Sequence, residues 1–225
     1  MSWSEGAGAL FDEWAAAGRG ERMASGHERL AGATLDALEL DGAARLLDLG
    51  CGVGRALELA RERCPCALAG IDASAAMIER ARARLPGAEL QQASVDRLPF
   101  PDGAFSHVLS VEAIYYFEDP VAAFREVARV LEPGGAVALA LELYEENPGT
   151  HVWREQLSIP VHLLSAEAWC DRLREAGFVE VGHERVRCHD DKTWSPSPYF
   201  PSEELFAAYV REGALLLRGR RRSDP

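Results

Sequence analysis

The chain has 225 residues, a hydrophobic fraction of 48% and a charged fraction of 27%, which fits one α/β domain around a single core. No apolar run approaches the roughly 20 residues of a bilayer span, and the first residues lack the features of a secretory signal. The formal net charge of −12 disfavours contact with nucleic acid, which depends on Lys and Arg neutralising phosphates. We therefore expect a cytoplasmic protein with no membrane or nucleic-acid partner.

Two helices are predicted in the first 40 residues, ahead of any strand, from the spacing of Phe11, Trp14, Leu30 and Leu35. Seven β-rich apolar runs follow and alternate with amphipathic stretches, as in a doubly wound sheet. These runs cover residues 44–50, 67–72, 88–94, 105–111, 135–144, 178–187 and 213–220. The last two are joined by about 25 residues, which is longer than usual and is typical of a functional or mobile segment.

Helix starts and stops are indicated by capping residues as well as by apolar spacing. Asp119-Pro120 places a cap before a proline at the first helical position, and Ser74, Ser165 and Ser202 stand before further helices. Gly177 is placed to end the helix after Ser165 in a left-handed conformation.

A glycine-rich loop, Asp48-Leu49-Gly50-Cys51-Gly52-Val53-Gly54, joins the first strand run to a helical stretch. Glycines at such a turn let the backbone approach a ligand closely, and the helix N-terminus adds oriented N–H groups. Asp72 ends the next run, where a carboxylate accepts hydrogen bonds from both hydroxyls of a ribose. Loop and acid together predict a nucleotide-like ligand at the carboxyl ends of the strands.

The loop differs from a dinucleotide fingerprint in two ways. Its glycines are spaced GxGxG rather than GxGxxG. Asp48 would repel a pyrophosphate, yet it suits a ligand that bears an ammonium group and a sulfonium. A nicotinamide-dependent oxidoreductase is therefore disfavoured.

Four segments, in this order, carry a family resemblance: LLDLGCGVG, GIDASAAMIERARARL, LPFPDGAF followed by HVLSVEAIYYFEDP, and REVARVLEPGG. They resemble the class I S-adenosylmethionine-dependent methyltransferases, in particular the small-molecule group related to the ubiquinone and menaquinone enzymes. The resemblance covers about residues 44–187. It implies an α/β, Rossmann-like, seven-stranded and mostly parallel sheet with helices on both faces and an antiparallel last strand. It also implies S-adenosyl-L-methionine as cofactor.

The cofactor contacts that the resemblance implies lie in the loop and at the ends of the second, third and fourth runs: Asp48, Gly50, Cys51, Gly52, Asp72, Ala73, Ser94, Val95 and Ser110. The loop would line the methionine part, with Asp48 reaching its amino group directly or through water. Asp72 would hold the ribose, and Ala73 and Ser94-Val95 would contact the adenine. The family usually has Asp where Ser94 stands.

Methyl transfer is an in-line displacement, so the protein mainly orients two reactants and excludes water. No metal is expected. The candidate catalytic residues are Glu112, Tyr116 and His27. Glu112 would bind an amino acceptor or remove its proton; the alternative is a helix-starting Glu that contacts only solvent or a backbone N–H. His27 lies in the segment that often folds over the pocket in this family, although a capping or surface role is equally compatible.

We expect residues 1–225 to form one methyltransferase domain, with a helical cover at 1–40, a cofactor-binding core at 44–144 and acceptor-side covers at 145–165 and 188–211. The predicted function is methyl transfer to a small organic acceptor by a monomer or homodimer. The alternative is a non-catalytic S-adenosylmethionine-binding regulatory or partner protein. The pattern leaves open whether oxygen, nitrogen or carbon is methylated and whether a general base is used.

Overall fold

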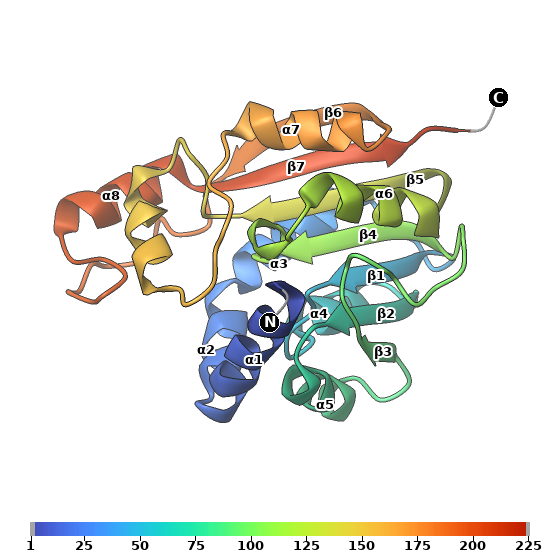
Figure 1. Cartoon of the computed structure of the whole chain (residues 1–225), viewed down its shortest axis with the longest axis horizontal. Coiled ribbons are helices and arrows are strands. Elements are labelled where there is room, and N and C mark those ends of the chain that lie inside the picture. Colours follow the sequence, from blue (N-terminus) through green and yellow to red (C-terminus); the bar gives the residue numbers. More distant parts are fainter. Residues whose placement is uncertain (1–2, 224–225) are drawn as a thin grey trace.

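A single seven-stranded sheet organises the computed structural model, which describes residues 3–223 (Figure 1). The strand order is β3-β2-β1-β4-β5-β7-β6. The strands are β1 (Arg45–Leu49), β2 (Ala67–Asp72), β3 (Glu89–Gln92), β4 (Phe105–Val111), β5 (Leu131–Leu141), β6 (Phe178–Val186) and β7 (Ala214–Arg221). The first five are parallel, and β7 is antiparallel to both β5 and β6. The expected Rossmann-like sheet with an antiparallel last strand is confirmed.

Helices cover both faces of this sheet. The cluster on one face includes side chains of α3 (Glu28–Asp36), α4 (Arg55–Arg63) and α5 (Ala75–Arg84), and the cluster on the other includes those of α6 (Pro120–Val130) and α7 (Ala166–Glu175). Leu46 and Leu47 are fully buried in opposite clusters, because successive strand residues point to opposite faces.

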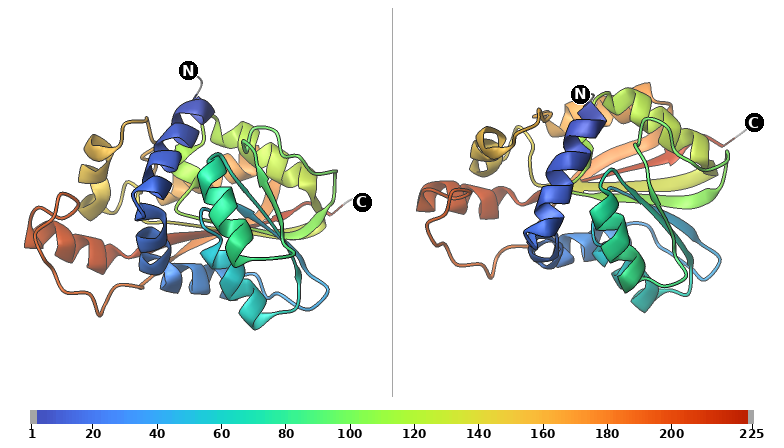
Figure 2. Two further views of the ribbon diagram at one scale, coloured as in Figure 1. Left: turned by 90° about the horizontal axis from the view of Figure 1, so that it is seen from below. Right: turned by 60° about the horizontal axis from the view of Figure 1, so that its bottom comes forward.

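The remaining helices gather at the end of the sheet to which β4 and β5 point (Figures 1 and 2). They are α1 (Trp3–Ala16), α2 (Arg19–Gly26), α8 (Glu203–Glu212) and the 3₁₀ helices η1 (Ile114–Tyr116) and η2 (Pro148–Gln156). The carboxyl ends of parallel strands are where α/β sheets bind ligands. These helices therefore cover the edge at which a ligand is expected.

The predicted caps are confirmed. Side-chain oxygens of Ser74, Asp119, Ser165 and Ser202 accept hydrogen bonds from backbone N–H groups in the first turn of α5, α6, α7 and α8. Gly177 follows α7 with φ 97, the left-handed conformation expected there.

Two element boundaries differ from the sequence prediction. The N-terminal region holds three helices rather than two, because the chain turns at Gly18 (φ 65) and again at His27, and α3 packs on the sheet instead of covering its edge. β5 begins at Leu131, directly after α6, because Leu131 pairs with Phe105 before a register shift. Within residues 3–223, every helix is too short or too polar to cross a membrane.

Candidate active site

The glycine loop after β1 has a backbone that glycine alone adopts readily. Gly50, Gly52 and Gly54 have φ values of 71, 51 and 83. A Cβ on Gly50 would lie 2.6 Å from the Ala113 Cβ, whereas one on Gly52 would meet no atom within 4 Å. The loop is thus packed closely at Gly50 and opens onto free space at Gly52.

That space is a groove made of two adjoining cavities, of about 130 and 70 Å³. Asp48, Gly50, Cys51, Gly52 and Asp72 line the first, and Gly50, Asp72, Ala73, Ser94 and Val95 line the second. Phe11, Ala113 and Tyr116 also line both. Eight of the nine predicted cofactor residues therefore lie along one groove.

Asp72 stands where the two cavities join. Its carboxylate accepts hydrogen bonds from the backbone N–H groups of Gly52 and Ser74, each at 2.9 Å. Burial raises the pKa of Asp72, and these two hydrogen bonds act in the opposite direction. Asp72 thus fixes the glycine loop to the end of β2 as well as facing the groove.

Asp48 is a buried carboxyl that faces the groove with 2% of the residue exposed. Burial, together with the nearby Asp72, raises the pKa of Asp48 to about 8. Among residues 3–223, no side chain or backbone group donates a hydrogen bond to it. A buried acid with no partner, aimed into a cavity, suits a ligand that brings a positive charge.

Ser110 is the predicted cofactor residue that the structure places elsewhere. It is fully buried within the sheet, lines neither cavity, and its hydroxyl donates to the Leu49 carbonyl at 2.8 Å. This hydrogen bond ties β4 to β1, and the cofactor contact of Ser110 stays a prediction. Conversely, Asp96 lines the second cavity and accepts a hydrogen bond from the Ser94 hydroxyl at 2.6 Å.

A third cavity, of about 510 Å³, adjoins the groove. It shares Trp14, Met23, His27, Glu112 and Tyr116 with the groove. Its further aromatic lining is Tyr115, Trp153, Tyr199, Phe200 and Tyr209. The lining of this cavity comes from the N-terminal helices, the segments after β4 and after β5, and the segment between β6 and β7, which meet at one end of the sheet (Figure 2).

Glu112 lies at the junction of groove and third cavity, but both of its oxygens are engaged. One accepts from the Glu142 backbone N–H at 2.5 Å and the other from the Tyr115 hydroxyl at 2.8 Å. Burial, followed by the charge of Glu142, raises the pKa of Glu112 well above its usual value. The position therefore resembles the alternative in which Glu112 contacts a backbone N–H.

His27 also lies at this junction, between α2 and α3, with 21% of its side chain exposed. Its Nε2 is 3.7 Å from Glu142 Oε2. Burial lowers the pKa of His27, although the charge of Glu142 opposes the shift. The imidazole is thus uncharged near neutral pH and able to accept a proton.

Glu142, which follows β5, was not predicted from the sequence. It is 1% exposed, accepts a hydrogen bond from the Tyr209 hydroxyl at 3.0 Å, and contacts His189 Nε2 through the same oxygen. Burial raises the pKa of Glu142, but the interactions with neighbouring groups, first among them the hydrogen bond with His189, outweigh it and bring the pKa below its usual value. An ionised carboxylate therefore lies behind His27. The sequence feature that could have identified Glu142 was an acidic residue at the carboxyl end of a predicted strand.

Two overlapping sets of side chains in this region could hold a metal ion. Ligand atoms of His27, Glu112 and Glu142, and those of Glu142, Cys188 and His189, lie within 4.8 Å of one another in each set. The expectation of a metal-free site stays a prediction.

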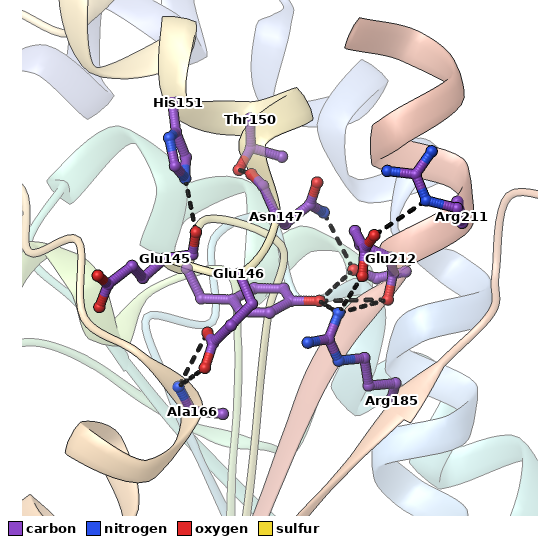
Figure 3. Close-up of polar contacts among 11 residues, drawn as sticks. Glu145, Glu146, Asn147, Thr150, His151, Ala166, Arg185, Arg211 and Glu212 are labelled. Atoms are coloured by element: carbon purple, nitrogen blue, oxygen red, sulfur yellow. Dashed lines mark hydrogen bonds and ion pairs between the residues drawn. The ribbon is translucent and has the colours of Figure 1, made fainter. Parts of the chain in front are cut away.

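A polar network ties the segment after β5 to the start of β7. Arg185 donates to the Tyr144 hydroxyl at 3.0 Å and pairs with Glu212 at 2.6 Å, and Asn147 Nδ2 donates to the Gly213 carbonyl at 3.1 Å (Figure 3). The Thr150 hydroxyl completes the link by donating to the Glu142 carbonyl at 3.2 Å. The acceptor-side wall is thereby fixed next to Glu142.

Comparisons with known proteins agree with this geometry. A methyltransferase domain model matches residues 47–139. The chain is 32% identical to 27-O-demethylrifamycin SV methyltransferase of Amycolatopsis mediterranei, over 75% of this chain and 64% of that protein. It is also 32% identical to trans-aconitate 2-methyltransferase of an Acidovorax species, over 74% of this chain and 70% of that protein. The chain thus spans less than two thirds of the length of the rifamycin methyltransferase.

A solved structure matches the chain over most of its length. It is a chain of the complex between the Haloferax volcanii Trm112 methyltransferase activator and a protein described as a methyltransferase. The TM-score is 0.87 and the identity 32%, over 94% of this chain and 97% of that one. Fold, glycine loop and relatives together show that the chain belongs to the class I S-adenosylmethionine-dependent methyltransferases.

Proposed function

We propose that the chain transfers the methyl group of S-adenosylmethionine to a small organic acceptor. The observation that carries the proposal is the junction between the groove and the 510 Å³ aromatic cavity, which share His27, Glu112 and Tyr116. One compartment suits the cofactor and the other an organic molecule. The named relatives act on a rifamycin and on trans-aconitate, both small molecules.

The groove fits the cofactor that the family uses. Asp48 offers a buried, unpartnered carboxyl to an ammonium group, and the open space at Gly52 admits the methionine part. Asp72 lies between the two cavities, where a ribose would bind, and Ser94 and Val95 would contact the adenine. When bound, S-adenosylmethionine supplies a methyl carbon that its sulfonium activates for displacement.

The chain's own residues would orient the acceptor and take up its proton. His27 is uncharged, faces both compartments and has the Glu142 carboxylate behind it, so it can accept a proton and be stabilised as imidazolium. Tyr116 lines all three cavities and would set the angle between acceptor and methyl carbon. We assign Glu112 to holding the ends of β4 and β5 together rather than to proton transfer.

The non-catalytic alternative receives less support, because a cofactor-binding partner protein has no need of an aromatic-lined cavity beside its groove. We further propose that residues 1–225 act as one domain. The helices α1 and α2, together with residues 145–165 and 188–211, would exclude water from the acceptor. All five cysteines are free, which supports a reducing, cytoplasmic location.

Two measurements on purified protein test the proposal. Calorimetric titration with S-adenosylmethionine tests the groove, and labelled-methyl transfer over a panel of small metabolites tests the chemistry. His27→Ala is the matched control, because it should bind the cofactor and fail to transfer the methyl group. Tight cofactor binding with no transfer to any acceptor would instead support the non-catalytic alternative.

A further inference from the structure

Three cationic side chains line the acceptor cavity: Arg19, Arg22 and Lys192. Arg22 and Lys192 are exposed and Arg19 is half-buried, so they mark the end of the cavity that faces solvent. Lys192 is the only lysine in the chain. A positive end is unexpected in a chain whose net charge is −12.

None of the three has a carboxylate partner within 4.0 Å among the side chains of residues 6–223. The Arg19 guanidinium instead lies 3.5 Å from the centre of the Trp14 ring and 5.2 Å from that of Tyr199. Arg22 donates only to the Ala17 carbonyl, at 3.3 Å. Nearby Arg29, by contrast, pairs with Asp191 at 2.7 Å. An acidic side chain, Asp191, is therefore present next to Lys192, but it neutralises Arg29, which lies outside the cavity.

The two acids that line the cavity lie at its buried end and do not neutralise these cations. Both oxygens of Glu112 are engaged, one by the Glu142 backbone N–H and the other by the Tyr115 hydroxyl. Glu142 is occupied by Tyr209 and His189. The cavity thus has a positive entrance, aromatic walls and an acid–base end next to the cofactor groove.

We propose that the methyl acceptor is an organic anion, whose carboxylate or phosphate group binds Arg19, Arg22 and Lys192 while its apolar or aromatic body fills the cavity. This inference rests on the proposed function and specifies its substrate class. Guanidinium groups bind carboxylate and phosphate through paired N–H donors. The aromatic stacking of Arg19 holds its guanidinium in place before a ligand arrives, so little ordering is required on binding. The atom to be methylated would then lie at the opposite end, next to His27.

The test compares matched ligands that differ in charge. Protein saturated with S-adenosylhomocysteine is titrated with phenylacetate, benzyl phosphate and the neutral phenylacetamide, and dissociation constants are measured by calorimetry or ligand-observed NMR. We expect at least one of the two anions to bind about tenfold more tightly than the amide, the gain of one charge-assisted hydrogen bond. The order of phenylacetate and benzyl phosphate distinguishes a carboxylate from a phosphate substrate.

Variants locate the binding site of the anion. Arg19→Gln should remove most of the preference for the anion, and Lys192→Gln should reduce it by about two- to fivefold, as for an exposed ion pair. Arg125→Gln, which neutralises an exposed and unpaired arginine on α6, should leave the preference unchanged. Because Lys192 is exposed, its variant remains informative even if Arg19→Gln lowers stability.

Equal affinity for phenylacetamide and both anions, or a full preference for the anion in both variants, would overturn the inference. The proposed function fails separately, if S-adenosylhomocysteine itself does not bind. Cofactor binding together with transfer to neutral acceptors at the same rate in wild type and Arg19→Gln would refute only the substrate class.

Discussion

Asp48→Asn should change stability and cofactor affinity in opposite directions. The carboxyl of Asp48 is buried and receives no hydrogen bond among residues 3–223, so its ionisation opposes folding. The same isolation makes it available to the ammonium group of the cofactor. Replacing it by the neutral isostere therefore removes a source of instability and a ligand contact together.

The size of the stability effect follows from the pKa of Asp48, which is about 8 in the folded chain against an ordinary value of 3.8. Because the pKa of Asp48 is raised in the folded state, the contribution of this carboxyl to the free energy of unfolding is fully present below pH 3.8. It is lost as the pH rises toward 8. Each pH unit in this window lowers the free energy of unfolding by at most about 1.4 kcal/mol. Between pH 5 and 7.5 the wild type should therefore lose up to about 3 kcal/mol through this group, and Asp48→Asn should not.

The affinity effect comes from one charge-assisted hydrogen bond, which contributes about 1.5–3 kcal/mol and corresponds to about 10- to 150-fold in the dissociation constant. Urea denaturation at pH 5, 6 and 7.5 gives the first effect, and calorimetric titration with S-adenosylmethionine at pH 7.5 gives the second. Glu13→Gln, which neutralises an exposed carboxylate on α1, is the control. Parallel stability–pH curves for wild type and Asp48→Asn would refute the reasoning about burial, and unchanged affinity would refute the ammonium contact.

Three further predictions concern the groove and its covers. Asp72→Ala should weaken cofactor binding by about 30- to 1,000-fold. It should also lower the free energy of unfolding by about 1–3 kcal/mol, because two backbone N–H groups lose their acceptor. Wild-type affinity in a destabilised variant would contradict the ribose contact. His27→Ala should reduce turnover by about 100-fold or more with little change in cofactor affinity, and wild-type activity should persist somewhat below pH 6.5, because burial lowers the pKa of His27. Hydrogen exchange should slow in residues 8–30 and 188–205 when cofactor product and acceptor bind, and equal rates with and without ligands would rule out their covering role.

The sheet and the cofactor groove could be predicted from sequence because their signals are local. Each strand run was a short segment of local sequence, most of them rich in apolar residues, and each predicted cap lies next to the helix that it starts. The glycine loop and Asp72 are positioned by β1 and β2, which pair directly along their length. For Ser110, the strand-end position did not reveal the direction of the side chain, and here its hydroxyl donates a hydrogen bond to the neighbouring strand.

The acceptor side was only partly predictable, because it is assembled from segments far apart in the chain. Glu142 acquires its character from His27, His189 and Tyr209, and no spacing along the sequence brings these four residues together. Likewise, the positive entrance depends on α2 and the segment after β6 reaching the same cavity. Tertiary packing, rather than periodicity, determines such sites.

The single lysine gives this protein an unusual experimental property. Lys192 is exposed at the entrance of the acceptor cavity, so an amine-selective reagent has no other side-chain target in the chain. A fluorophore or a ¹³C-methyl group attached to the Lys192 amine would report from the entrance, without mutagenesis to remove other lysines. Protection of this one amine by a bound molecule would give a direct screen for ligands in a mixture of metabolites.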